Sequence, residues 1–138
     1  MKLLKKLVLI LFTFSLLGCV DEDNEFYGYI SYYGDEFAGN RTASGAIFDP
    51  NKYTCASRTL PFGTILEVMN TENNKTVIVM VNDRGPYVEN RILDISKRSA
   101  QKIDMIEKGV IFAKIKILKR GNGTFSEEDY NNMIREYY

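Results

Sequence analysis

The stretch VNDRGPY, Val81–Tyr87, joins the end of an apolar β-branched run to a polar turn. Aspartate readily closes a turn on its own backbone, and Gly85-Pro86 stiffens the chain that follows. An aspartate fixed at the end of a strand is a candidate functional carboxylate. Asp83 therefore has two interpretations, a reactive group at the edge of a cleft or a cap of its own loop.

Short strands are predicted on both sides of this stretch. They cover residues 27–33, 65–69, 76–81, 91–95 and 110–118, and Asn73-Asn74 supplies a hairpin turn between the second and third. The last strand alternates apolar and polar residues over 113–117. Many short strands with little helix favour a mainly β fold, a closed β-barrel.

Two short helices are expected beside the strands. Ser96 can cap a helix that reaches about Ile103, and Ser126 can cap a second one. The second helix carries a stripe at helical spacing, made of Tyr130, Met133, Ile134 and Tyr137. We expect this tail, residues 121–138, to begin at a Gly121–Gly123 hinge and to pack its stripe on the barrel. The alternative is that the stripe binds a partner, such as an envelope or division protein.

The composition excludes several function classes. The 138 residues include 18 basic and 18 acidic side chains but no histidine. Ser-His-Asp catalysis, Cys-His catalysis and imidazole-bound zinc are therefore excluded. No dense basic patch indicates nucleic-acid binding, and we expect neither a metal nor a cofactor. Cys55 is interpreted as a small buried hydrophobe, with a thiol that pairs between chains as the alternative.

The N-terminus predicts export and lipidation. Residues 1–18 combine three lysines with the apolar run Leu7–Leu17 and form a signal peptide. Leu16-Leu17-Gly18-Cys19 resembles a bacterial lipobox, so Cys19 would carry lipid and residues 19–26 would form an acidic tether. The alternative is an ordinary secretory signal. We expect the protein on a membrane of the cell envelope, with the periplasmic face of an outer membrane favoured and the outer face of the cell membrane otherwise.

Five segments carry a family resemblance. They are Ser31–Gly34, Thr42–Gly45, Arg58–Thr64, Val81–Tyr87 and Arg91–Ser96. In this order they resemble the rare lipoprotein A (RlpA) family over residues 27–119. The resemblance implies a six-stranded double-psi β-barrel over residues 27–120. It also implies an endolytic peptidoglycan transglycosylase, which cleaves glycan strands without water and leaves 1,6-anhydro-muramyl ends in wall remodelling or division.

Carboxylates must supply the chemistry in a chain without histidine. A carboxylic acid can protonate the leaving oxygen and, as carboxylate, accept the proton of the sugar 6-hydroxyl. We expect Asp83 to play both roles, with Asp94 beside it raising its pKa; helix capping is the alternative for Asp94. Arg84 is a candidate for binding substrate carboxylates, or alternatively a partner of the two aspartates. The other substrate-binding candidates are Tyr32, Tyr33 and Thr42, where strand alternation lets only one of the two tyrosines face the cleft.

The chain departs from the family pattern at two positions. Ala46 stands where the family has a glutamate thought to be catalytic, and Ser57 stands where it has a histidine. Asp35 or Glu36 are possible replacements for the glutamate. The alternative function is accordingly a catalytically degenerate, expansin-like lipoprotein that binds peptidoglycan.

Overall fold

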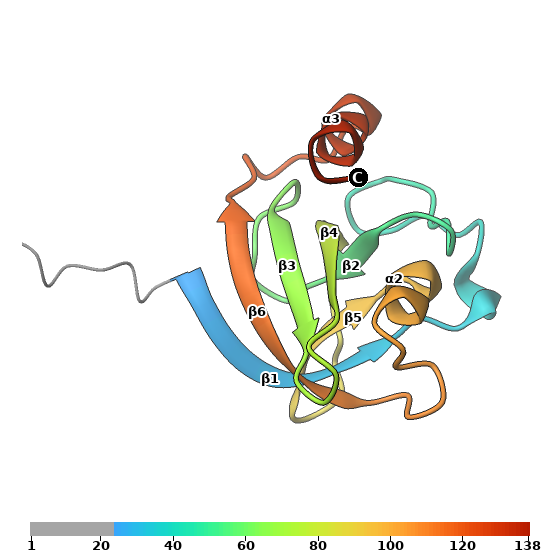
Figure 1. Cartoon of the computed structure of the whole chain (residues 1–138). Coiled ribbons are helices and arrows are strands. Elements are labelled where there is room, and N and C mark those ends of the chain that lie inside the picture. Colours follow the sequence, from blue (N-terminus) through green and yellow to red (C-terminus); the bar gives the residue numbers. More distant parts are fainter. Residues whose placement is uncertain (1–23) are drawn as a thin grey trace, which may run out of the picture.

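The computed structural model describes residues 24–138 (Figure 1). The predicted signal peptide, Cys19 and most of the tether lie outside the described residues. The elements in chain order are β1 (Glu25–Tyr32), the 3-10 helix η2 (Asp35–Phe37), β2 (Thr54–Ala56), β3 (Ile65–Asn70), β4 (Thr76–Asp83), β5 (Arg91–Ile95), α2 (Lys97–Lys102), β6 (Ile111–Lys119) and α3 (Glu127–Tyr137). None of the helices in this part of the chain is long and apolar enough to span a membrane.

The six strands close into a barrel in the order β1-β5-β2-β4-β3-β6, as predicted. The pairs β1/β5 and β2/β4 are parallel and the other four pairs are antiparallel. The β3–β4 hairpin turns at Asn73-Asn74, where Asn74 has the positive φ of 59° that asparagine tolerates. Each strand therefore has one face toward the barrel interior and one face outward.

The interior is filled by alternating aliphatic side chains. Strand β6 shows the predicted period of two, since Ile111, Ala113, Ile115 and Ile117 are buried. Cys55 is also fully buried in this core, which confirms its interpretation as a small hydrophobe. Its strand, β2, was missed by sequence reasoning because three residues are too few to show a period.

Both predicted helix caps are present. The Ser96 hydroxyl accepts a hydrogen bond from the backbone N–H of Ser99. Ala100 of α2 is fully buried against the core. The Ser126 hydroxyl accepts one from the backbone N–H of Asp129. Each cap satisfies a backbone donor that the first turn of a helix leaves unpaired.

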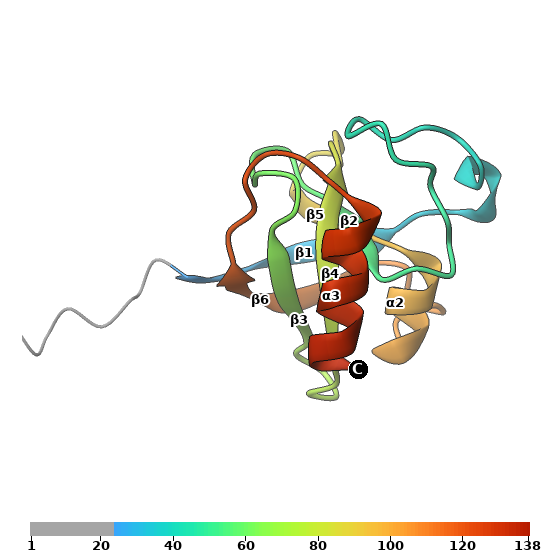
Figure 2. The ribbon, with the colours of Figure 1, turned by 90° about the horizontal axis from the view of Figure 1, so that it is seen from above.

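Helix α3 packs on the outer face of the barrel, as Figure 2 shows. Tyr130 and Met133 are buried against Ile65 and Met80, in a second apolar cluster outside the barrel. The Tyr130 hydroxyl also accepts a hydrogen bond from the backbone N–H of Tyr53, at 2.9 Å. This confirms that the stripe packs on the domain, and its two buried residues are therefore not available to the alternative partner.

The Gly121–Gly123 segment is fastened to the barrel. The N–H of Gly121 donates to Thr64 Oγ1 at 3.0 Å, and the N–H of Gly123 donates to the carbonyl of Phe62 at 3.1 Å. A Cβ at Gly121 would lie 2.2 Å from that same carbonyl oxygen, so only glycine permits this approach. The prediction of a hinge is therefore wrong, because the segment is used for close contact.

Candidate active site

Four neighbouring strands place one residue each in a row on the outer face of the barrel. Ala56 of β2 is the Cα partner of both Asp94 in β5 and Asp83 in β4, and Asp94 is also the partner of Ser31 in β1. Adjacent strands lie about 4.8 Å apart, so the Cα atoms of the two aspartates are about 10 Å apart. Only the methyl group of Ala56 stands between them. We call Ser31, Asp94, Ala56 and Asp83 the carboxylate row.

A β-bulge directs Asp83 outward. The β4 residues Val77, Val79 and Val81 belong to the interior core, and strict alternation would turn Asp83 inward as well. The register shifts between Cys55 and Ala56, so that Asn82 is an extra residue on β4. A bulge of this kind re-aims the following side chain and is frequent beside active sites.

Three donors converge on the Asp83 carboxyl group. The Tyr33 hydroxyl donates to Oδ2 at 2.7 Å, and the backbone N–H groups of Ala43 and Arg84 donate to Oδ1 at 2.9 and 2.8 Å. The Arg84 contact is the loop cap proposed as the structural alternative for Asp83. The Ala43 contact holds residues 38–48, a loop closed by an isolated bridge between Arg41 and Ile47. Asp83 thus caps its own turn and also anchors a second loop beside the row.

The pKa of the Asp94 carboxyl group is raised from its ordinary value. Burial is the largest cause, and the negative charge of Asp83 adds to it. The Ser31 hydroxyl, which donates to Oδ1, and the positive charge of Arg91 oppose the shift. Burial and the charge of Asp83 therefore favour the protonated form of Asp94, the residue that sequence reasoning placed beside the expected acid.

The two adjacent tyrosines point to different sides, as strand alternation requires. Tyr33 reaches Asp83, and its ring packs on Phe48 at 4.8 Å between centroids. Burial raises the pKa of the Tyr33 phenol, and the hydrogen bond to Asp83 raises it further, so the hydroxyl remains a donor. Tyr32 instead packs on the barrel core and donates to the carbonyl of Ile106 at 3.0 Å. Of the two tyrosines, only Tyr33 contacts the carboxylate row.

Arg84 and Thr42 are occupied by contacts within the chain. Arg84 Nη1 donates to the carbonyls of Ser57 and Leu60 at 3.0 and 2.9 Å, and its guanidinium lies 3.9 Å from the centroid of the Phe62 ring. The side chain therefore pairs with neither aspartate. Thr42 is 8% exposed, and its hydroxyl lies 2.9 Å from that of Ser44. Both side chains shape the loops of the site in this structure.

The two departures from the family pattern supply no acid to the row. The backbone N–H of Ser57 donates to the Asp83 carbonyl at 3.1 Å, and its hydroxyl accepts from the backbone N–H of Leu60 at 3.1 Å. Ala46 contributes a methyl group to the 38–48 loop. Asp35, a possible replacement for the glutamate, forms an ion pair with Lys97 at 2.7 Å. Among residues 24–138, no group of three acidic or thiol side chains could hold a metal ion.

Sequence reasoning found both aspartates and Tyr33 but missed Ser31 and Ala56. Ser31 lies in a segment that carried the family resemblance, yet its role appears only when β1 and β5 are paired. Ala56 has no functional group, and its small side chain leaves open space between Asp83 and Asp94. No local sequence signal identifies either residue.

The closed barrel of six strands, with parallel and antiparallel pairs, is a double-psi β-barrel. A family model described as "Lytic transglycolase" matches residues 25–115, and the chain belongs to this family. It is 50% identical over 105 residues to a probable endolytic peptidoglycan transglycosylase RlpA of Treponema pallidum, covering 76% of this chain and 32% of that protein. It is 38% identical over 119 residues to the endolytic peptidoglycan transglycosylase RlpA of Helicobacter pylori, covering 86% and 37%. The chain thus spans about a third of the length of these relatives.

Solved structures share the barrel at low sequence identity. The Streptomyces papain inhibitor matches with a TM-score of 0.58 and 23% identity, over 72% of this chain and 99% of that one. A mutant expansin of Clavibacter michiganensis in complex with cellohexaose matches with a TM-score of 0.56 and 17% identity, over 72% and 52%. At these identities the likeness establishes the fold alone.

Proposed function

We propose that this barrel cleaves the glycan strands of peptidoglycan as an endolytic transglycosylase. The observation that carries the proposal is the carboxylate row, which presents Asp83 and Asp94 at one level with only a methyl group between them. The names of the relatives from Treponema pallidum and Helicobacter pylori support this substrate and reaction.

The proposed reaction divides acid and base between the two aspartates. Asp94, with its raised pKa, gives its proton to the glycosidic oxygen as the bond to C1 of the muramyl sugar breaks. The 6-hydroxyl of that sugar attacks C1, and its proton passes to Asp83. Solvent then returns the proton from Asp83 to Asp94, and the product carries a 1,6-anhydro end. Tyr33 orients Asp83 through its hydrogen bond.

Digestion of purified sacculi tests the reaction. The test protein is the segment 24–138, because it contains all six strands and both apolar clusters. We expect anhydro-muramyl products by mass spectrometry, and their loss in both Asp83→Asn and Asp94→Asn. Full activity of either variant removes that residue from the mechanism. No product from the wild type, on sacculi or on glycan freed of stem peptides, refutes the reaction.

Binding without cleavage is the second candidate function. It is favoured by Ala46 and Ser57, which leave the site without the two polar groups expected from the family. This function predicts that the wild-type domain sediments with sacculi while the number of glycan chain ends stays constant. The same digestion therefore separates the two candidates.

The proposed location is the cell envelope, with Cys19 carrying lipid and binding the chain to a membrane. The Leu-Leu-Gly-Cys sequence after an apolar segment supports this proposal. Cells fed an alkyne-tagged fatty acid should incorporate it into the wild-type protein and not into Cys19→Ala. Equal labelling of both proteins would refute lipidation at Cys19.

A further inference from the structure

Three aromatic side chains are exposed together on the outer face of β1 and β6. Tyr27 is 56% exposed, Tyr29 is 51% exposed and Phe112 is 42% exposed. Tyr29 and Phe112 are direct Cα partners across the two strands, with ring centroids 5.2 Å apart. The rings of Tyr27 and Phe112 are nearly parallel, at 19° and 6.0 Å. We call these three residues the aromatic patch.

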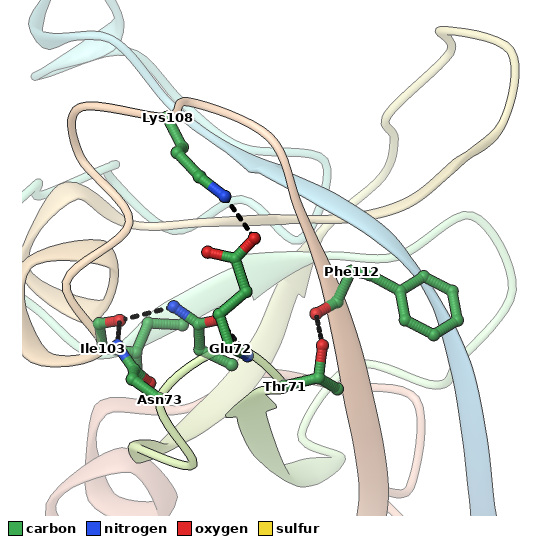
Figure 3. Close-up of polar contacts among 7 residues, drawn as sticks. Thr71, Glu72, Asn73, Ile103, Lys108 and Phe112 are labelled. Atoms are coloured by element: carbon green, nitrogen blue, oxygen red, sulfur yellow. Dashed lines mark hydrogen bonds and ion pairs between the residues drawn. The ribbon is translucent and has the colours of Figure 1, made fainter.

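The patch lies on a well-fixed part of the barrel. Phe112 is held through its backbone, because its carbonyl accepts hydrogen bonds from the hydroxyl and the N–H of Thr71 at 2.8 and 3.3 Å. Figure 3 shows the Phe112 ring projecting from β6 on the side away from the ion pair between Glu72 and Lys108. Rings presented by paired strands lose little conformational freedom when a ligand covers them.

The patch is continuous with the carboxylate row along β1. Tyr27, Tyr29 and Ser31 alternate on the same outer face of this strand, and Ser31 is the first residue of the row. At about 3.3 Å per residue, Tyr29 lies about 7 Å and Tyr27 about 13 Å from Ser31 along the strand. Arg91, the Cα partner of Tyr29, stands between the patch and Asp94. A linear polymer lying along β1 would contact the rings and reach the carboxylates.

The charges around the patch are balanced. Lys114 pairs with Glu25 at 3.5 Å, and Lys116 is the Cα partner of both Glu25 and Glu67. The two glutamates match the two lysines and Arg91 faces Asp94, so the patch lacks the cluster of about four to eight cations that binds an anionic membrane surface. These side chains offer hydrogen-bond donors and acceptors beside apolar ring faces, the combination that suits a sugar polymer.

We infer that the aromatic patch is a glycan-binding track that holds the amino sugars next to those at the carboxylate row. The inference rests on the proposed function for the identity of the glycan. The apolar face of each pyranose ring packs on a tyrosine or phenylalanine ring, and the hydroxyl and N-acetyl groups bond to the flanking lysines and glutamates. Contacts remote from the reacting bond position the polymer and favour cleavage within a strand over cleavage at its end.

Binding measured without cleavage tests the track. In a background of Asp83→Asn and Asp94→Asn, the triple variant Tyr27→Thr, Tyr29→Thr and Phe112→Thr retains residues that favour β-strands but has no rings. We expect the dissociation constant for stem-free glycan strands to rise about tenfold, equivalent to about 1.4 kcal/mol. Tyr137→Ala, which removes an exposed tyrosine from α3, is the matched control and should bind as the background protein does.

Three results would overturn the inference, and all are independent of whether the barrel cleaves glycan. The first is unchanged glycan binding by a triple variant whose far-ultraviolet circular dichroism matches the background protein. The second is binding to phosphatidylglycerol vesicles that depends on the three rings while glycan binding does not. The third is a change from dimer to monomer in the triple variant, which would identify a second copy of the chain as the occupant. A variant with Tyr27→Phe and Tyr29→Phe keeps all three rings, and glycan binding equal to that of the background protein would support ring stacking as the source of affinity.

Discussion

Replacing Asp83 separates its structural role from its proposed chemical role. In Asp83→Ala the Tyr33 hydroxyl and the N–H groups of Ala43 and Arg84 lose their acceptor. Each hydrogen bond contributes on the order of 1 kcal/mol net, so the free energy of unfolding should fall by about 3 kcal/mol. Asp83→Asn retains an oxygen for the two N–H groups and should lose about 1 kcal/mol or less.

The assay is thermal unfolding of segment 24–138 followed by circular dichroism, together with digestion of sacculi. At about 4 °C per kcal/mol for a domain of this size, Asp83→Ala should melt about 12 °C below the wild type. Asp83→Asn should melt within about 4 °C of the wild type and should still release no product. Equal melting temperatures of the two variants would show that the carboxyl group does not hold the 38–48 loop and would refute this account of the site.

Three further predictions follow from burial, charge and backbone contact. The raised pKa of Asp94 means that the fold favours its protonated form, so its contribution to stability is present below pH of about 4 and is lost as the pH rises. Urea titrations from pH 3 to 8 should therefore show Asp94→Asn gaining stability relative to the wild type as the pH rises. A difference in the free energy of unfolding that stays constant with pH would contradict the raised pKa. Met133→Ala should lower the free energy of unfolding by about 2–4 kcal/mol because the side chain is 1% exposed, whereas the exposed control Asn131→Ala should stay within about 0.5 kcal/mol. Gly121→Ala places a Cβ against the Phe62 carbonyl and should reduce the melting temperature measurably, and a neutral effect would show that the tail moves freely.

The strands that sequence reasoning predicted share a strong local signal. Residues 65–69, 76–81 and 91–95 combine β-branched or aliphatic side chains with turn residues at their ends, and the structure has strands β3, β4 and β5 there. Strand β2 had no such signal. It lies between β5 and β4, and its three residues are all buried. Its formation as a strand therefore depends on pairing with segments that are distant in the chain.

The two aspartates and Tyr33 could be predicted from the sequence, but their geometry could not. The motifs indicated Asp83 and Asp94, but the direction of Asp83 depends on the bulge at Asn82, which only the pairing with β2 creates. The contacts of Arg84 were equally hidden. Its guanidinium stacks on Phe62, 22 positions away in the chain, and this leaves the carboxyl groups without the cation that the sequence placed beside them.

The carboxylate row also determines when the proposed activity can arise during folding. Its four residues come from four strands, and Ser31 and Asp94 are separated by 63 positions in the chain. Contacts of such long range form slowly because closing the long intervening loop costs conformational entropy. Asp83 and Asp94 are aligned only through Ala56 of β2, so the proposed activity requires that β2 is paired with both β4 and β5.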